Sequence, residues 1–202
     1  MKYFLVICVM ALSAIGTTCN TESLDTGVIV PLEIGTVWEG VMVNKHADST
    51  DSVVSSYAVT DTVSVGSEKW HVIQRIDGSK IRYTGACTNR KDGLWFTSFG
   101  TDSVTVSKYA MMYALYPANQ NQIYQGMEVE TRVRVCGLHD TVTVPAGTFE
   151  CVSYCWDDAE SMSRGVIYLA PGVGWVKEQL TDEFDRSRST SWELVRIKKP
   201  RK

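Results

Sequence analysis

Six cysteines and three histidines are the residues of this 202-residue chain whose types could support metal binding or nucleophilic catalysis. Cys136 and His139, followed by Cys151 and Cys155, provide four ligands of the kind that bind zinc. The first pair has the spacing of a metal knuckle, but the second pair lies about 13 Å apart if it belongs to one extended strand. We therefore expect no metal and no cofactor, and zinc at these four residues is the alternative.

Disulfide bonds are the favoured prediction for the cysteines, because the thiols of an exported chain meet an oxidising environment. A hairpin turn at Pro145–Gly147 brings residues at matching distances on its two sides face to face. Cys136 then lies opposite Cys155, and we expect a disulfide between them. Cys151 would pair with Cys87 elsewhere in the sheet, since Cys151 and Cys155 are too far apart along one strand to form a bridge. Free buried thiols are the alternative.

The histidines form no recognisable catalytic pattern. His46 and His139 lie near predicted turns, and His71 lies within an apolar strand. No Gly-x-Ser-x-Gly elbow, His-Glu-x-x-His helix or papain-like cysteine context accompanies them. A nucleophile needs a base within hydrogen-bonding distance, and no local segment supplies that pair. We predict that the chain has no catalytic residues and is not an enzyme. A hydrolase that uses His71, or His139 with Asp140, is the alternative.

The charged residues do not indicate a specific ligand. Two acidic groups, at residues 157–160 and 181–185, fall in predicted hairpin loops and lack the EF-hand pattern. We interpret them as solvated loop charge rather than as calcium sites. The chain has 20 Lys and Arg against 23 Asp and Glu, which gives a formal charge of −3. A nucleic-acid-binding domain needs a basic face, so no nucleic-acid partner is expected.

The N-terminal residues 1–18 have the pattern of a secretory signal peptide. The apolar run Tyr3–Ile15 is shorter than the roughly 20 residues that cross a bilayer. Gly16–Cys19 resembles a bacterial lipoprotein box, in which Cys19 is acylated, whereas Ala14–Gly16 fits ordinary signal cleavage. Acylation leaves an even number of cysteines in the mature chain. We therefore predict a lipid anchor at Cys19, a polar tether through residue 29 and a location in the bacterial cell envelope, with a secreted or periplasmic soluble protein as the alternative.

Residues 30–202 are predicted to form one all-β domain. Apolar and polar residues alternate from Trp38 onward, which places one face of each strand against a core. Turn sequences such as Asp77–Ser79 and Lys91–Gly93 separate the strands. Only Lys108–Tyr116 has apolar spacing that fits a short helix, and a strand is its alternative. We expect an antiparallel meander of short strands, curled into a barrel, half-barrel or sandwich, with at most one short helix.

Three segments carry a family resemblance. Val144–Cys151 resembles a VPAGTF hairpin, and Tyr168–Lys177 resembles a YAPGVGxVK hairpin with Leu169 inserted. Pro31–Trp38 is similar to a first strand with the pattern G-x-x-W. In this order the segments look like a group of uncharacterised bacterial exported lipoproteins with an all-β meander. The resemblance implies the fold and the compartment. Backbone geometry explains the turn residues, so none of them is carried over as catalytic.

The tryptophans are spread along the predicted strands. If the sheet curls without closing, they could line an apolar cleft for a lipid or another small ligand. The candidates for this cleft are Trp38, Trp70, Trp95 and Trp175, and packing within the core is the alternative. We predict a non-enzymatic lipoprotein, held at a membrane by its N-terminal lipid, whose domain binds an envelope protein or an apolar ligand. A structural envelope component without a ligand is the alternative.

Overall fold

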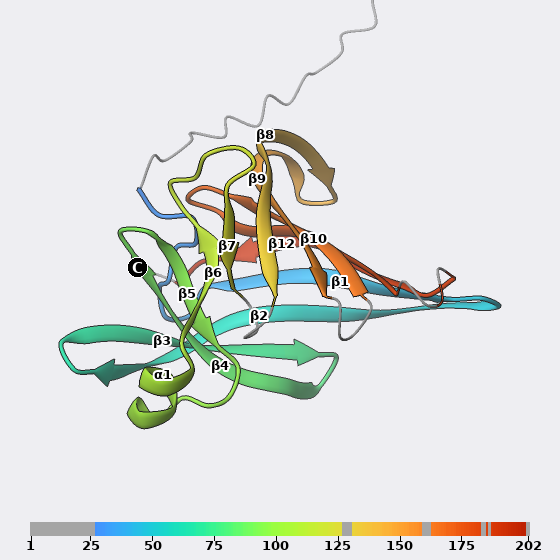
Figure 1. Cartoon of the computed structure of the whole chain (residues 1–202). Helices are drawn as coiled ribbons and strands as arrows, with labels where there is room; N and C mark the ends of the chain where they lie inside the picture. Colours follow the sequence, from blue (N-terminus) through green and yellow to red (C-terminus); the bar gives the residue numbers. More distant parts are fainter. Residues whose placement is uncertain (1–26, 127–130, 159–162, 183–184, 186, 201–202) are drawn as a thin grey trace, which may run out of the picture.

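The computed structural model describes residues 27–126, 131–158, 163–182, 185 and 187–200, and its strands form an all-β domain with one short helix (Figure 1). The predicted fold class is therefore confirmed. The predicted signal peptide and Cys19 lie outside the described residues. In chain order the elements are β1 (Val37–His46), β2 (Ser49–Val65), β3 (Glu68–Asp77), β4 (Lys80–Arg90), β5 (Gly93–Thr97), α1 (Ser103–Tyr109), β6 (Met111–Leu115), β7 (Ile123–Gln125), β8 (Arg132–Val144), β9 (Gly147–Asp158), β10 (Ser163–Ala170), β11 (Gly174–Asp182) and β12 (Ser189–Lys198).

The strands form a single antiparallel sheet that curls into a nearly closed barrel. Its strand order is β6-β5-β4-β3-β2-β1-β12-β11-β10-β9-β8-β7. The chain runs as a meander from β1 to β6 and again from β7 to β12, and β1 pairs with β12, so the first and last strands lie side by side in the middle of the sheet. The edges of the sheet are β6 and β7. They approach each other across a gap in the hydrogen-bonded ladder, which we call the seam.

The tight turns lie where the sequence predicts them. β3 ends at Asp77 and β4 begins at Lys80, and these two residues pair in the ladder, so Gly78 and Ser79 form the turn between them. In the turn between β10 and β11, Gly172 has a φ of 72°. Only glycine adopts this left-handed conformation without a steric penalty, which agrees with the turn predicted at Pro171-Gly172.

The helix α1 begins after Asp102, which caps its N-terminus. The Asp102 carboxylate accepts hydrogen bonds from the backbone N–H groups of Val104 and Thr105, at 3.1 and 2.9 Å. The helix ends at Tyr109 and the chain continues as β6 from Met111. The segment Lys108–Tyr116, predicted as either a helix or a strand, therefore contains the last residues of α1 and the whole of β6.

The helix α1 lies against the outer face of the barrel (Figure 1). A small second core of side chains lies between them. The side chain of Val106, on α1, packs there against Trp70 and Ala86, and all three are buried. Within the described residues, the helical structure offers no segment of the length and hydrophobicity needed to cross a membrane.

Trp38 connects the first strand to the hairpin of β10 and β11. Its ring is fully buried, and its indole N–H donates a hydrogen bond to the Val173 carbonyl at 2.6 Å. A Cβ atom on Gly174, whose φ is 98°, would lie 2.9 Å from Trp38 Nε1. A glycine is therefore required where the turn packs on the tryptophan. Two of the segments that carry the family resemblance are thus parts of one packed unit.

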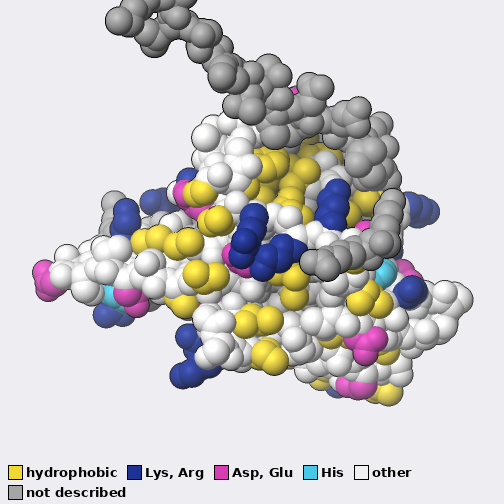
Figure 2. Space-filling view, turned by 180° about the vertical axis from the view of Figure 1, so that it is seen from behind, with side chains coloured by type: hydrophobic (Ala, Val, Ile, Leu, Met, Phe, Trp, Pro, Cys, Tyr) yellow, Lys and Arg dark blue, Asp and Glu magenta, His cyan; other side chains and the backbone are white. Residues whose placement is uncertain are grey.

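The face of the molecule opposite to that in Figure 1 has a mixed surface. Figure 2 shows hydrophobic side chains there in several groups, with Lys and Arg side chains between them. In the described part of this face, charged side chains thus separate the apolar side chains into several groups. Apolar side chains from α1, β5, β6 and β7 gather instead around the seam.

Candidate functional site

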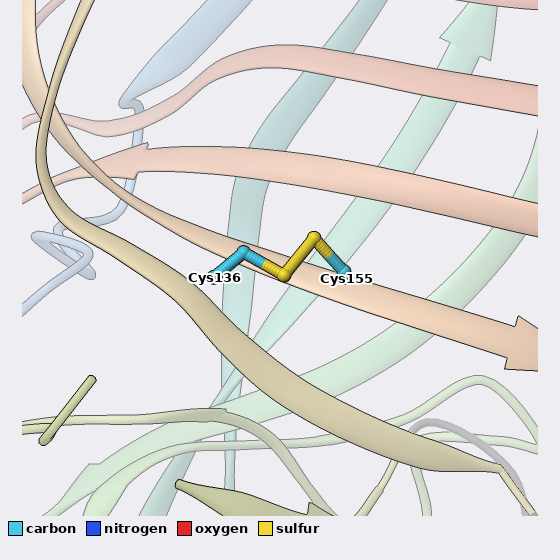
Figure 3. The surroundings of a disulfide bond; sticks show 2 residues. All are labelled: Cys136 and Cys155. Atoms are coloured by element: carbon cyan, nitrogen blue, oxygen red, sulfur yellow. A yellow bond between two sulfur atoms is a disulfide. The ribbon is translucent and has the colours of Figure 1, made fainter. Parts of the chain in front are cut away.

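Cys136 and Cys155 form a disulfide between β8 and β9, with their Cα atoms 6.0 Å apart (Figure 3). This confirms the first predicted pair. The ladder between these strands is not regular, because its register shifts on both sides of Gly137. Cys136 lies at the first of these irregularities. The disulfide therefore joins the strands where the ladder of hydrogen bonds is interrupted.

The second predicted disulfide is wrong, because Cys87 and Cys151 are free thiols. Both are fully buried, and their strands β4 and β9 lie far apart in the sheet order. Burial raises the pKa of the Cys87 thiol far above its usual value and that of Cys151 to about 12. Both thiols are therefore neutral at physiological pH, which makes them poor nucleophiles and poor metal ligands.

Within the described residues, the histidines form no catalytic arrangement. The four zinc-type ligands of the alternative prediction form no metal site there either. His71 lies opposite Cys87 in the ladder of β3 and β4, and burial, helped by Lys69, lowers its pKa. His139 pairs with Glu150 rather than with Asp140, on an exposed surface, with 2.8 Å between Nδ1 and Oε1. The disulfide uses two of the four zinc-type ligands, and no group of three or more His, Cys, Asp or Glu residues in the described chain is arranged to hold a metal.

The four candidate tryptophans lie on opposite faces of the sheet. Trp38 and Trp175 are buried inside the barrel, with ring centroids 5.0 Å apart. Trp70 and Trp95 belong to the outer cluster under α1, where the Arg90 guanidinium lies 4.3 Å from the centroid of the Trp95 ring. They therefore do not line one common cleft. Trp95 alone reaches an open apolar cleft, which lies outside the barrel next to the seam.

This seam cleft has a volume of about 510 Å³ and is bounded by α1, β5, β6 and β7. Its volume is in the range of sites that bind small organic molecules. Most of the lining is apolar or aromatic, and Lys108 is its one charged lining residue among those described. The lining residues are Trp95, Phe99, Lys108, Tyr109, Ala110, Met111, Met112, Tyr124 and Gln125.

Tyrosine hydroxyl groups close the barrel beside this cleft. The Tyr124 hydroxyl, on β7, donates a hydrogen bond to the Tyr113 carbonyl of β6 at 2.8 Å. The Tyr154 hydroxyl, on β9, donates to the Leu115 carbonyl of β6, also at 2.8 Å. These carbonyls lie on the edge strand, where no neighbouring strand supplies N–H groups, so side chains satisfy them. Tyr124 belongs to both features, since it also lines the cleft.

A cluster of polar side chains lies on the inner face of the barrel. Tyr57, Arg75 and Tyr83 stand directly opposite one another on β2, β3 and β4, which places them on the same face. From the other side of the barrel, the Glu178 carboxylate of β11 accepts a hydrogen bond from the Tyr57 hydroxyl at 3.2 Å. Tyr113, on β6, completes the cluster, and its hydroxyl accepts a hydrogen bond from Trp175 Nε1 at 3.2 Å. We call these residues the interior cluster.

Burial dominates the electrostatics of this cluster. It raises the pKa of Glu178, and the positive charge of Arg75 and the hydrogen bond from Tyr57 offset only part of that effect. The tyrosines Tyr57, Tyr83 and Tyr113 also have raised pKa values, first because of burial and then because of the Glu178 charge. A carboxylate among apolar rings and neutral hydroxyl groups is unusual in a barrel interior, and perturbed groups of this kind mark candidate functional sites.

The interior cluster is not among the sites predicted from the sequence. A signal was present, because the alternation that buries Val176 places Glu178 two residues later on the same face. A charged residue at such a position is informative, since unpaired carboxylates are rarely buried. The other members come from β2, β3, β4 and β6, and only the curling of the sheet brings them together.

Comparisons with known proteins identify the fold. No protein-family model and no curated protein matches the sequence. Among solved structures, the chain is similar to "a putative exported protein with YmcC-like fold" from Bacteroides fragilis, with a TM-score of 0.55 and 16% identity over 86% of this chain and 100% of that one. It is also similar to "a putative lipoprotein" from Parabacteroides distasonis, with a TM-score of 0.49 and 17% identity over 85% of this chain and 99% of that one. The first likeness shows a shared fold, which is the nearly closed antiparallel barrel described above.

Proposed function

We propose that this protein is a non-enzymatic, lipid-anchored component of the bacterial cell envelope, and that its barrel binds a single-chain anionic amphiphile in the seam cleft. The observation that carries the proposal is the cleft itself. Apolar side chains from four separate elements converge on one open volume of about 510 Å³. Sites for small organic ligands are typically mostly apolar, with a few polar groups that fix the orientation.

The chemistry of the lining supports an apolar chain as the main part of the ligand. Met111 and Met112 form one wall from β6, and methionine side chains adapt to irregular apolar shapes. Trp95, Phe99 and Tyr109 supply aromatic surface, and the rings of Phe99 and Tyr109 are 5.1 Å apart. Burying an apolar chain against this surface contributes about 25 cal/mol per Å².

Lys108 supports an anionic group at one end of the ligand. Its Nζ lies 4.9 Å from the centroid of the Tyr109 ring, at the rim of the cleft. No acidic residue lines the described cleft, so the ammonium group is not neutralised from within the lining. A carboxylate placed beside it would gain a charge-assisted hydrogen bond.

A titration with a dansyl-labelled fatty acid tests this function. Energy transfer from Trp95 to the dansyl group should increase and saturate as the cleft fills. Met112→Glu should weaken binding by about tenfold or more, because it places an unpaired charge in an apolar site. The matched control is Val104→Glu, since Val104 is 74% exposed on the same helix as Lys108 and does not line the cleft. Absence of saturation, or equal binding by the two variants, would contradict the proposal.

The charge at the rim has a separate test. Lys108→Ala should weaken binding of the fatty acid several-fold and leave the corresponding fatty alcohol unchanged, because only the acid gains from the ammonium group. Equal losses for both ligands would show that Lys108 contributes apolar contact and no charge recognition.

The lipid anchor is tested by fractionation of bacterial cells. The parent protein should sediment with membranes, and Cys19→Ala should release it into the soluble fraction, because the substitution removes the acylated thiol. A parent protein that stays soluble would refute the anchor while leaving the proposal for the cleft untouched.

A further inference from the structure

A second cavity, which we call the polar groove, lies apart from the seam cleft. It has a volume of about 460 Å³ and is bounded by β8, β10 and β11. Val142 is the one aliphatic side chain among its described lining residues, and the others are Asp140, Thr141, Thr143, Tyr168, Lys177 and Gln179. The two cavities share no described lining residue, so the role of the polar groove is independent of the function proposed for the seam cleft.

The strands β10 and β11 form one wall of the polar groove. Tyr168 and Lys177 stand directly opposite each other in their ladder, which places both side chains on the same face of the sheet. Gln179 lies two residues further along β11 and therefore shares this face. Glu178 lies between Lys177 and Gln179 and points the other way, toward Tyr57. The polar groove is thus on the opposite side of the sheet from the interior cluster.

Two bulges in β8 position the opposite wall. The register with β9 shifts between Val135 and Gly137 and again between Gly137 and Asp140, and each shift places one extra residue in β8. Bulges of this kind redirect side chains and are frequent beside functional sites. The Asp140 carboxylate lies against Gly137, where a Cβ atom would overlap it. The glycine therefore leaves room for Asp140 at the edge of the groove.

The rest of the molecule holds this wall in place. The Cys136–Cys155 disulfide joins β8 to β9 beside the bulges. Beyond the end of β8, in the turn to β9, the Ala146 N–H donates a hydrogen bond to the Leu194 carbonyl of β12 at 3.1 Å. Val142, in the middle of the wall, is buried and packs into the core. A wall that is already formed reduces the entropy lost when a ligand binds.

The polar groups of the groove have unused hydrogen-bonding positions. Among the described residues, nothing donates to the Asp140 carboxylate, and neither the Gln179 amide nor the Tyr168 hydroxyl has a hydrogen-bond partner. A carboxylate accepts hydrogen bonds, whereas an amide and a phenol both donate and accept them. Lys177 forms an ion pair with Glu193, with 2.7 Å between Nζ and Oε1. The described lining therefore offers free donors and acceptors, and its one cation is already paired.

This combination excludes several classes of ligand. An apolar molecule would leave the polar groups without partners. Because Asp140 and Lys177 lie in the same groove, a ligand of either charge would meet a like charge. A metal ion needs several oxygen ligands, and Asp140 is the one carboxylate among the described lining residues. A neutral molecule with many hydroxyl groups meets none of these obstacles.

We propose that the polar groove is a binding site for a neutral saccharide. The half-buried ring of Tyr168 packs against the C–H face of one sugar ring, since tyrosine combines an apolar ring with a polar tip. Asp140 accepts hydrogen bonds from sugar hydroxyl groups, and Gln179 both donates and accepts them. Thr141 and Thr143 are exposed, so the groove is open to solvent and a saccharide chain can enter it from the side.

A panel of trisaccharides tests the site. Maltotriose, cellotriose, mannotriose and triacetylchitotriose are neutral, and each is titrated into the protein by calorimetry and by saturation-transfer NMR. At least one should bind saturably, with one molecule per chain. Trigalacturonic acid should bind about tenfold more weakly than the best neutral probe, because Asp140 repels its carboxylates. No saturable binding by any neutral probe, or tighter binding of the acid, would overturn the proposal.

Two substitutions locate the binding in the groove. Asp140→Ala should weaken binding of the best probe about tenfold, because hydrogen bonds to a charged group are lost. Gln179→Ala should weaken it several-fold, and its exposed position means that the fold is unaffected. The matched control is Asp51→Ala, since Asp51 is exposed on β2 and does not line the groove. Unchanged binding by both groove variants, or an equal loss in the control, would place the site elsewhere.

The contribution of the tyrosine ring has its own pair of variants. Tyr168→Phe keeps the ring and should bind nearly as tightly as the parent, whereas Tyr168→Leu should bind several-fold more weakly. Equal binding by the two variants would refute the packing of a sugar on this ring.

The monosaccharide unit of the best probe distinguishes two sources of the same chemistry. If the trisaccharide binds about tenfold more tightly than its monosaccharide, the groove contacts several sugar rings and its ligand is a glycan chain. Equal binding of the two indicates a free sugar.

Discussion

Replacing Tyr154 by phenylalanine tests whether tyrosine hydroxyl groups close the barrel. Tyr154 is 1% exposed, and its hydroxyl donates to the Leu115 carbonyl of the edge strand β6 at 2.8 Å. Phenylalanine keeps the ring and its packing, so the substitution removes the hydrogen bond alone. The Leu115 carbonyl is then left without its donor at the seam. The seam should become the least stable part of the barrel.

The expected loss follows from the cost of an unsatisfied buried acceptor. Leaving a buried carbonyl without its partner costs about 1–3 kcal/mol, and the shielded position of Tyr154 supports the upper part of this range. Tyr124→Phe should cost less, about 0.5–1.5 kcal/mol, because Tyr124 is half-buried and water can replace the hydroxyl group at the Tyr113 carbonyl.

Urea unfolding followed by tryptophan fluorescence measures the loss. The midpoint should fall while the slope with denaturant stays constant, since the fold is unchanged. Hydrogen exchange should quicken first in β6 and β7. The control is Tyr168→Phe, because the Tyr168 ring is half-buried and its hydroxyl makes no hydrogen bond within the described residues. This control should change stability by less than about 0.5 kcal/mol. If Tyr154→Phe costs no more than the control, the hydroxyl groups do not hold the seam.

Three further predictions follow from the cysteines and from the interior carboxylate. Replacing Cys136 and Cys155 by serine should lower the free energy of unfolding by about 3 kcal/mol, since the bridge closes a loop with a sequence separation of 19; an equal unfolding midpoint for oxidised parent and variant would contradict this. Peptide mapping after alkylation of the native protein should find Cys87 and Cys151 unlabelled, and labelled only after unfolding, because burial raises both thiol pKa values; rapid labelling of either thiol would show that its site opens. Burial raises the pKa of Glu178 above its usual value of 4.5, so the folded state holds this proton more tightly than the unfolded state. The corresponding stability is complete below about pH 4.5 and declines as the pH rises through the folded pKa. Glu178→Gln should therefore gain stability over the parent with rising pH in urea titrations, and a difference that is constant with pH would refute the reasoning.

Local patterns in the sequence were sufficient to predict the fold class and one disulfide. Alternation of apolar and polar residues predicted the strands, because the side chains of a strand point to opposite faces in turn. The turn at Pro145–Gly147 brought Cys136 near Cys155, since a hairpin fixes the approximate register of its two strands. The predicted disulfide was correct despite the register shifts around Gly137. A disulfide can form over a range of more than about 2 Å in the distance between the two Cα atoms.

These local patterns could not predict which distant segments pair with each other. Cys87 and Cys151 both carry the apolar character of core residues, and no local signal shows that β4 and β9 lie far apart around the sheet. The separation of Trp38 and Trp175 from Trp70 and Trp95 likewise depends on which face of each strand turns inward.

The sequence by itself determined the elements that depend on neighbouring residues: the strands, the tight turns, the hairpin of β8 and β9, and the expectation of an N-terminal lipid signal. Only the tertiary structure decided the candidate sites. The seam cleft exists because β6 and β7, far from each other in strand order, meet when the sheet curls. The interior cluster exists because the same curvature brings Glu178 of β11 to Tyr57 of β2. Both sites arise from long-range closure, which depends on the twist and packing of the whole sheet rather than on any short segment.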